Sequence, residues 1–88
     1  MYNIEISPSA LKALERLKKG QKNIADRIAS NIDRLKSEPY SGKKLLGELS
    51  NFRSLRAGGY RILYTIIEKR ILIQVLKIAH RKGAYRQQ

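Results

Sequence analysis

Apolar and polar positions along the chain follow two different periods. Residues 2–6 alternate between apolar and polar, as a short strand does, and residues 7–38 then carry apolar side chains at every third or fourth position, as amphipathic helices do. Alternation returns in three later segments, 52–57, 60–67 and 71–79. The pattern therefore predicts a strand, a pair of helices and a further set of strands, in that order.

Capping signals set the limits of the two predicted helices. Ser7 can accept a hydrogen bond from a free backbone N–H and Pro8 fits a first helical turn, so the first helix begins there and ends at Gly20. The second helix ends before Pro39. The apolar stripes are Leu11, Leu14 and Leu17 in the first helix and Ile24, Ile28, Ile32 and Leu35 in the second. We expect the helices to form a hairpin that buries these stripes.

Together the elements predict an α+β fold with the order β-α-α-β-β-β. Segment 40–51 contains Ser41-Gly42, Gly47 and Ser50-Asn51 and is predicted to be a loop. We expect an antiparallel sheet with the two-helix hairpin packed on one face and the other face open. A chain of 88 residues builds one modest core, so residues 1–88 are interpreted as a single domain.

The first hairpin of the predicted sheet brings two cations together. Gly58-Gly59 fits a two-residue turn, because both positions of such a turn adopt positive φ, and this turn places Arg56 directly opposite Arg61. Like charges in that position destabilise a sheet by up to roughly 1 kcal/mol, so we expect the pair either to hold an anion or to spread into water. Tyr60 and Tyr64 alternate to the other face and are expected in the core.

A turn at Glu68-Lys69 is predicted to join the last two strands. In that register the open face that carries Arg61 also receives side chains from the last strand, namely Leu72, Gln74, Leu76, Ile78 and His80. A face that is half cationic and half apolar suits a polyanion over the arginines and an apolar segment of a protein partner beside them. The residues expected to bind that protein are Leu63, Leu72, Leu76 and Ile78.

Charge narrows the choice of partner. The chain has 19 Lys and Arg against 7 Asp and Glu, a formal net charge of +12, and residues 43–88 hold 11 of the basic and 2 of the acidic side chains. Such an excess attracts polyanions at long range, so nucleic acid is the first expected partner, an acidic protein the second and an anionic membrane surface the third.

The sequence indicates no disulfide or metal site, no signal peptide and no membrane span. The chain has no Cys and one His, which excludes disulfides and cysteine-ligated metals and makes us expect no metal and no cofactor. The N-terminus lacks the pattern of a signal peptide, and the most apolar segment, Ile71 to Ile78, is far shorter than a membrane span. We expect a cytoplasmic protein.

Two short motifs near the C-terminus resemble those of a known family. The motifs are Leu55-Arg56-x-Gly58-x-Tyr60-Arg61-Ile62-x-Tyr64 and His80-Arg81-Lys82-x-x-Tyr85-Arg86. They resemble the RelE branch of the RelE/ParE toxin superfamily, and the predicted order of elements fits that fold over essentially the whole chain. The resemblance implies a toxin that enters the ribosomal A site and cleaves messenger RNA without a metal, by attack of a ribose 2′-hydroxyl on the adjacent phosphate. It also implies a cognate antitoxin protein.

The resemblance assigns roles to individual residues. It implies that Arg61 stabilises the charge that develops on the phosphorane, that Arg81 assists the leaving 5′-oxygen, and that Tyr85 stacks on or orients a base. Family members carry two lysines at the positions of Phe52 and Ser54, which this chain lacks.

Substitutes for those lysines are available close by. Arg53 lies between the two positions but points to the other face in the predicted register, so Arg56 and His80 are the expected replacements; the identity of the general base stays open. Further cations are expected to contact messenger or ribosomal RNA, and these are Lys43, Lys44, Arg53, Lys77, Lys82 and Arg86.

Alternatives to this interpretation remain for both the residues and the protein. Arg61 could pair with Glu48 or Glu68, His80 could be a surface or capping residue, and Tyr85 could tether the C-terminal tail to the sheet. The same fold also serves ParE-like inhibitors of DNA gyrase, and the missing lysines would suit a degenerate, non-catalytic RNA-binding member.

Overall fold

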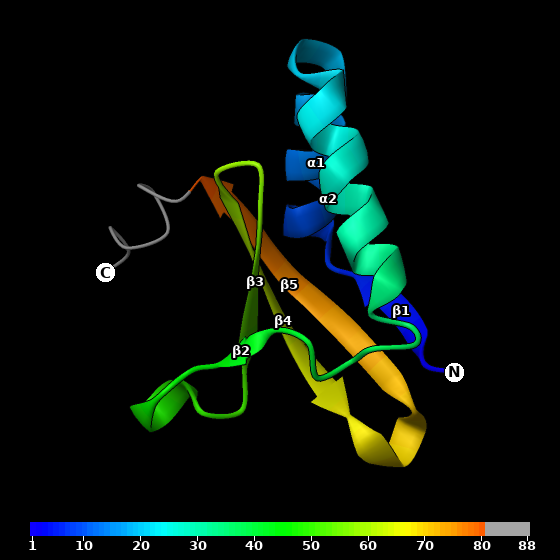
Figure 1. The fold of residues 1–88 in the computed structure, drawn as a ribbon, viewed down its shortest axis with the longest axis vertical. Coiled ribbons are helices and arrows are strands. Elements are labelled where there is room, and N and C mark those ends of the chain that lie inside the picture. The colour runs from blue at the N-terminus through cyan, green and yellow to red at the C-terminus, as the bar shows by residue number, and fades with distance from the viewer. Residues whose placement is uncertain (81–88) are drawn as a thin grey trace.

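The computed structural model describes residues 1–80 of the chain and confirms the predicted α+β class (Figure 1). Its helices and strands are β1 (Asn3–Ile6), α1 (Pro8–Gly20), α2 (Lys22–Arg34), β2 (Lys43–Lys44), β3 (Arg53–Ala57), β4 (Tyr60–Ile67) and β5 (Leu72–His80). Two 3-10 turns, η1 (Gly47–Leu49) and η2 (Glu68–Arg70), stand before β3 and β5. The predicted loop 40–51 therefore contains a short strand and a turn that the pattern did not reveal.

The strands form one sheet in the order β1-β5-β4-β3-β2, and both helices lie on the same side of it (Figure 1). Three of the neighbouring pairs are antiparallel, as expected, but β1 pairs with β5 in parallel, with Asn3 beside Leu72 and Ile6 beside Val75. A short turn forces antiparallel pairing on the strands that it joins. No such turn joins β1 to β5, because the helices and the rest of the sheet lie between them in sequence.

The core lies between the helices and the inner face of the sheet. Tyr64 is fully buried there, and the other large side chains that are fully buried come from α2, its C-terminal end, β4 and β5: they are Ile28, Leu35, Ile62, Ile73 and Val75. Ser7 caps α1 by accepting from the Ala10 N–H at 3.1 Å. Leu11, which the sequence pattern places in the buried stripe, is instead 44% exposed on α1.

The predicted register of the β3–β4 hairpin is confirmed. Arg56 lies opposite Arg61, and Ala57 lies opposite Tyr60. Gly58 and Gly59 join them with φ values of 55° and 83°, a left-handed conformation that side chains disfavour. The two arginines therefore leave the outer face of the sheet side by side.

The predicted turn between β4 and β5 is wrong. A two-residue turn at Glu68-Lys69 would pair Ile67 with Arg70, whereas the chain continues through η2 and Ile71, and the first pair is Ile67 with Leu72. Ile71 adopts a left-handed conformation with φ 49°. The longer turn moves the register of β5.

A β-bulge then changes which face the end of β5 presents. The β4–β5 ladder shifts so that Leu76 has no partner in β4, and from there on Ile78 pairs with Ile62 and His80 with Tyr60. One extra residue sends every following side chain to the opposite face. Ile78 is consequently 6% exposed and belongs to the core, and His80 shares a face with Tyr60 rather than with Arg61.

The bulge and the burial of β5 also break up the predicted apolar surface. Leu72 is 8% exposed, and it lies between Ile67 of β4 and Asn3 of β1. Leu72 and Ile78 therefore cannot offer their side chains to a partner, and both assignments are wrong. Leu63 and Leu76 are half-buried, and their contact with a protein stays a prediction.

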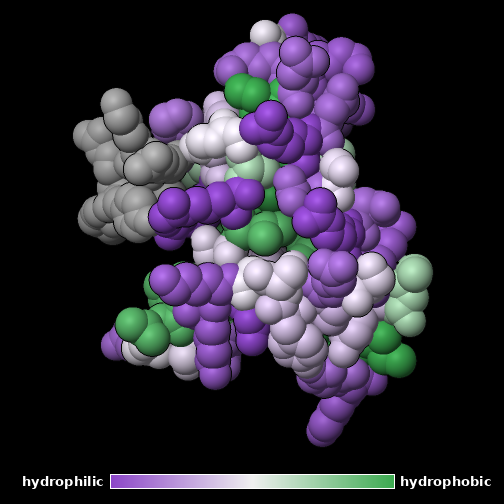
Figure 2. All heavy atoms as spheres, in the orientation of Figure 1, coloured by the Kyte–Doolittle hydropathy of each residue, from purple (hydrophilic) through white to green (hydrophobic). Residues whose placement is uncertain are grey.

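Figure 2 shows a mainly hydrophilic surface over the helices and a hydrophobic patch at the lower left, over the segment that carries η1. That segment contains two exposed leucines, Leu46 and Leu49, with exposed fractions of 89% and 52%. Among the described residues, neither helix has the length and apolar character needed to cross a bilayer.

Candidate nucleic-acid interface

Tyr64, in the core, holds the loop that leads into β2. Its buried hydroxyl donates to the Pro39 carbonyl at 2.8 Å and accepts from the Gly42 N–H at 2.9 Å. A Cβ atom at Gly42 would lie 2.5 Å from the same hydroxyl, so only glycine allows this approach. Burial raises the pKa of the Tyr64 phenol, which keeps it protonated and able to donate.

Arg53 braces the same loop from the side. Its Nη1 donates to the Gly42 carbonyl at 2.7 Å and to the Tyr40 carbonyl at 3.4 Å, and its guanidinium lies 5.0 Å from the centroid of the Tyr40 ring. Arg53 pairs with the core residue Tyr64 across the sheet, so it points to the face expected for it. The Arg53 guanidinium thus already has partners within the protein. Its contact with RNA stays a prediction.

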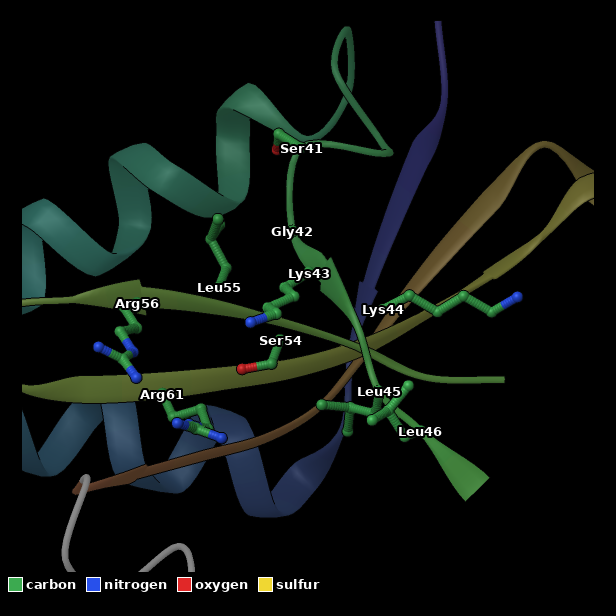
Figure 3. A pocket seen from close by; sticks show the side chains of 10 residues that line it. All are labelled: Ser41, Gly42, Lys43, Lys44, Leu45, Leu46, Ser54, Leu55, Arg56 and Arg61. Atoms are coloured by element: carbon green, nitrogen blue, oxygen red, sulfur yellow. The ribbon is translucent and has the colours of Figure 1, made fainter. Parts of the chain in front are cut away.

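A basic hollow of about 720 Å³ lies between this loop and the β3–β4 hairpin. We use that name for the space lined by Ser41, Gly42, Lys43, Lys44, Leu45, Leu46, Ser54, Leu55, Arg56 and Arg61. In Figure 3, Lys43 extends toward the two arginines and Lys44 extends the opposite way. The lining contains four cations and no carboxylate, so the hollow attracts anions.

Within residues 1–80, neither Arg56 nor Lys43 forms a salt bridge, since the ion pairs there are Lys22 with Asp26 and Lys36 with Asp33. Arg56 is exposed, and its partner across the ladder, Arg61, is half-buried. Two guanidinium groups on opposed positions repel each other. A phosphate that takes hydrogen bonds from both would remove that repulsion and gain charge-assisted bonds.

An apolar hollow of about 290 Å³ lies beside the basic hollow on the outer face. It is lined by Leu45, Leu46, Leu49, Arg61, Leu63, Lys77 and Ala79. Arg61, Leu45 and Leu46 line both hollows. Arg61, which is predicted to act in catalysis, therefore lies between the two hollows.

The structure brings together part of the predicted site. Lys43, Lys44, Arg56 and Arg61 line the basic hollow, while Lys77 lies beside the apolar hollow instead. His80 forms a T-shaped contact with the Tyr60 ring, with the ring centroids 5.2 Å apart, and does not line the basic hollow. The remaining predicted residues lie outside the described part of the chain, and they are Arg81, Lys82, Tyr85 and Arg86.

Sequence reasoning missed the residues that position the site. A tyrosine predicted in the core needs a partner for its hydroxyl, and this requirement could have pointed from Tyr64 to a nearby loop. Leu46 precedes η1 and Leu49 ends it, and Gly47 in that turn, with φ 67°, could have marked a surface loop at this point. In the described part of the chain, no group of three or more His, Cys, Asp or Glu side chains is placed to hold a metal.

Comparisons with known proteins agree with this architecture. The family model described as ParE toxin of type II toxin-antitoxin system, parDE, matches residues 4–85. Toxin RelE of Mycobacterium tuberculosis is 30% identical over 86 residues, which cover 97% of this chain and 87% of the relative.

Two solved structures share the fold and a similar level of identity. The toxin-antitoxin complex RelBE2 of M. tuberculosis contains a chain with a TM-score of 0.79 and 29% identity, and the alignment covers 91% of this chain and 98% of that one. A chain of the archaeal RelE-RelB complex of Pyrococcus horikoshii has a TM-score of 0.71 and 30% identity, with 91% and 94% covered. The resemblance seen in the motifs is thereby confirmed at the level of the superfamily.

Proposed function

The chain belongs to the ParE toxin family of type II toxin-antitoxin systems, within the RelE/ParE superfamily, and from this premise we propose that it is a ribosome-dependent endoribonuclease. Its substrate is messenger RNA in the ribosomal A site, and cleavage inhibits translation. The proposal places the reaction in the basic hollow and the protein in the cytoplasm, where ribosomes are found.

The opposed pair of Arg56 and Arg61 carries the proposal. The hairpin register puts both guanidinium groups on the outer face, Lys43 extends toward them, and no carboxylate lines the hollow they share (Figure 3). Opposed cations repel each other, and a phosphate bound between them offsets that repulsion and accepts charge-assisted hydrogen bonds. The basic hollow is therefore suited to binding an anionic substrate.

The proposed reaction needs charge stabilisation more than anything else. The ribose 2′-oxygen forms a bond to the adjacent phosphorus and the bond from phosphorus to the 5′-oxygen breaks, which gives a 2′,3′-cyclic phosphate and a 5′-hydroxyl. Arg56 and Arg61 bind the phosphorane oxygens as their negative charge grows, and Lys43 binds a flanking phosphate. One well-placed donor of this kind contributes about 10²- to 10³-fold in rate.

Protons move without net consumption in this scheme. The 2′-hydroxyl loses one proton to water, and the leaving 5′-oxygen gains one, for which Arg81 is the residue that the family resemblance suggests. His80 is not proposed as the base, since it lies beside Tyr60 and not on the wall of the basic hollow. The chemistry proposed here uses neither a metal nor a cofactor.

The same proposal includes a cognate antitoxin. Similar chains were solved as toxin-antitoxin complexes from M. tuberculosis and P. horikoshii, and this chain carries an apolar hollow next to its basic one. A protein that covers both hollows would block access of RNA to the site and inhibit the toxin.

A second candidate, inhibition of DNA gyrase, is favoured by one finding: the matching family model is that of ParE toxins. The hollow would then bind an acidic or phosphate-bearing surface without cleaving it. A degenerate RNA-binding member would likewise bind and not cleave.

One experiment separates the three. A defined message is translated with purified ribosomes and factors, with and without the protein, and 5′ ends are mapped; a parallel reaction measures supercoiling by gyrase. We expect new 5′ ends at A-site codons only when ribosomes are present, and none with Arg61→Ala, while Lys69→Ala, a substitution in η2 outside both hollows, behaves as wild type. Intact message with blocked supercoiling would support inhibition of DNA gyrase. Intact message with active gyrase would support a degenerate RNA-binding member.

A further inference from the structure

Tyr40 exposes an aromatic ring beside the loop that leads into β2. The residue is 53% exposed, and the Arg53 guanidinium lies 5.0 Å from the centroid of its ring. Among residues 1–80, the Tyr40 hydroxyl makes no hydrogen bond. Arg53 holds the loop through backbone carbonyls, which any residue at position 40 would provide. Holding the loop therefore does not by itself require an exposed aromatic ring.

The cations around the ring favour a nucleotide as its ligand. Arg53 lies against the ring, and Lys44 shares a face of the sheet with Arg53 because the two residues are paired across β2 and β3. Bases of unpaired RNA stack on aromatic rings and guanidinium planes, while cations bind the phosphates beside them. An exposed ring bordered by cations, in a chain with a net charge of +12, is therefore suited to an unpaired nucleotide.

Arg53 retains hydrogen-bond donors for a phosphate. A guanidinium donates from Nε and from both terminal nitrogens, and the hydrogen bonds of Arg53 within residues 1–80 both start from Nη1. The N–H groups on Nε and Nη2 can thus donate to a phosphate while Nη1 continues to hold the loop.

A small hollow beside Tyr40 can hold the polar edge of a stacked base. It has a volume of about 140 Å³ and is lined by Tyr40, Ser50, Asn51, Arg53, Ile66 and Glu68. Within the described part of the chain, the side chains of Ser50 and Asn51 make no hydrogen bond. Their hydroxyl and amide groups can pair with the N–H and C=O groups of an unpaired base. The volume is too small for a whole ligand, so the hollow accepts only part of a nucleotide.

We propose that Tyr40, Arg53 and Lys44 form a stacking site for one unpaired RNA nucleotide, whose base packs on the ring and whose phosphate binds the two cations. This inference rests on the proposed function, which supplies RNA as the partner. β2 lies at the edge of the sheet, and Lys43 and Lys44 extend from it in opposite directions (Figure 3). An RNA strand that crosses this edge meets the basic hollow on one side and the stacking site on the other. The nucleotide belongs either to the message or to ribosomal RNA, and the experiment distinguishes these sources.

Tyr40→Leu tests the stacking site, and Tyr40→Phe is the conservative variant. Leucine keeps an apolar side chain in the loop but removes the ring, whereas phenylalanine keeps the ring and removes the hydroxyl. Binding is measured by fluorescence anisotropy with a single-stranded RNA of about ten nucleotides, a typical length for single-strand sites. We expect Tyr40→Leu to raise the Kd about 5- to 150-fold, the range for losing one stacked base, and Tyr40→Phe to raise it less than about 2-fold.

Ribosomes identify the source of the nucleotide. The same variants are titrated with ribosomes that carry a message and with ribosomes that carry none. A loss of affinity in Tyr40→Leu that appears only on programmed ribosomes assigns the stacked base to the message. The same loss on ribosomes without message assigns the base to ribosomal RNA.

A measurement on the wild-type protein keeps the test valid if Tyr40→Leu does not fold, which thermal unfolding would show. The short RNA is prepared with 5-bromouridine, which crosslinks under ultraviolet light to an aromatic ring stacked on it. We expect mass spectrometry to find the crosslink on Tyr40. Crosslinks that form only at other residues would overturn the proposal.

The remaining outcomes separate this site from the proposed function. If wild type cleaves message while Tyr40→Leu and Tyr40→Phe bind RNA and ribosomes equally well, the stacking site is refuted and the proposed function stands. Equal weakening by both variants also refutes it, because the hydroxyl and not the ring would then matter. If only Tyr40→Leu weakens RNA binding but wild type does not cleave, the stacking site stands and the proposed cleavage fails. Unchanged RNA binding with weaker binding to the protein encoded by the adjacent gene would refute the site in favour of a protein contact.

Discussion

Replacing Tyr64 by phenylalanine removes one oxygen atom from the core and tests whether that atom positions the basic hollow. The hydroxyl lies between the Pro39 carbonyl and the Gly42 N–H, at 2.8 and 2.9 Å, and all three residues are buried. Tyr64→Phe leaves both backbone groups without their partner. Each buried unsatisfied group costs about 1–3 kcal/mol, and partial relaxation of the loop makes a total of about 2 kcal/mol a reasonable expectation.

That free energy is easy to measure in a chain of this size. For a domain of 60–100 residues, a loss of 1 kcal/mol lowers Tm by roughly 4–8 °C, so Tyr64→Phe should lower it by about 8–16 °C. The control is Tyr60→Phe, which removes a hydroxyl that makes no hydrogen bond within the described residues. Thermal unfolding followed by circular dichroism compares the two variants with wild type.

Activity provides the second measurement. Gly42 is followed directly by Lys43, so loosening the loop should lower cleavage on ribosomes by more than the loss of folded protein explains, whereas Tyr60→Phe should cleave as wild type does. The reasoning is refuted if Tyr64→Phe and Tyr60→Phe melt within about 2 °C of each other, or if Tyr64→Phe melts early yet cleaves at the full rate.

The remaining predictions concern pH, charge and packing. Burial raises the folded-state pKa of Tyr64 above the ordinary tyrosine value of 10.0, so the stability that the hydroxyl adds is complete below that pH and is lost as pH rises beyond it. The difference in unfolding free energy between wild type and Tyr64→Phe should therefore narrow above about pH 10. Arg56→Ala should lower the single-turnover cleavage rate about 10²- to 10³-fold with a much smaller change in ribosome affinity, and a matched loss of both would contradict its catalytic role. RNA affinity should fall with salt at a slope of roughly −0.7 per phosphate contact, reduced by about one contact in Lys43→Ala. Gly42→Ala, whose Cβ would meet the Tyr64 hydroxyl, should lower Tm, whereas Gly20→Ala, which meets open space in α1, should raise it or leave it unchanged.

Local signals predicted the parts of the fold that depend on neighbouring residues. Ser7 and Gly20 limit α1 as expected, and the Gly58-Gly59 turn alone was enough to fix the register that opposes Arg56 and Arg61. In these places the conformational demands of one or two residues decide the structure. The central feature of the basic hollow followed from such a demand.

Features that depend on distant contacts were not predictable from the pattern. The bulge at Leu76 was not predicted, because Val75 and Leu76 are both apolar and fit either register of β5, yet the bulge moves Ile78 and His80 to the opposite face. The parallel placement of β1 beside β5 depends likewise on how α1 packs, and a short strand such as β2 is too small to show a period.

The candidate site likewise combines residues placed by local signals with residues placed by distant contacts. Arg56 and Arg61 were placed by a turn, whereas Lys43, which extends toward them, follows a loop that Tyr64 and Arg53 hold from two sides. That contact joins residues more than ten positions apart and leaves no periodic trace. The apolar surface expected on β4 and β5 is only partly present: Leu63 lines the apolar hollow, but the bulge turns Ile78 into the core, and the exposed leucines of the hollow come from the segment around η1.

The claim that the basic hollow cleaves RNA through a ribose 2′-hydroxyl is tested most directly by removing that single group. Ribosomes are programmed with two messages that differ only by one 2′-deoxynucleotide on the 5′ side of the cleaved bond, and the products are resolved at nucleotide resolution. We predict that the all-ribose message yields a 2′,3′-cyclic phosphate and a new 5′-hydroxyl end, while the substituted message stays intact at that bond. Equal cleavage of both messages would contradict the account.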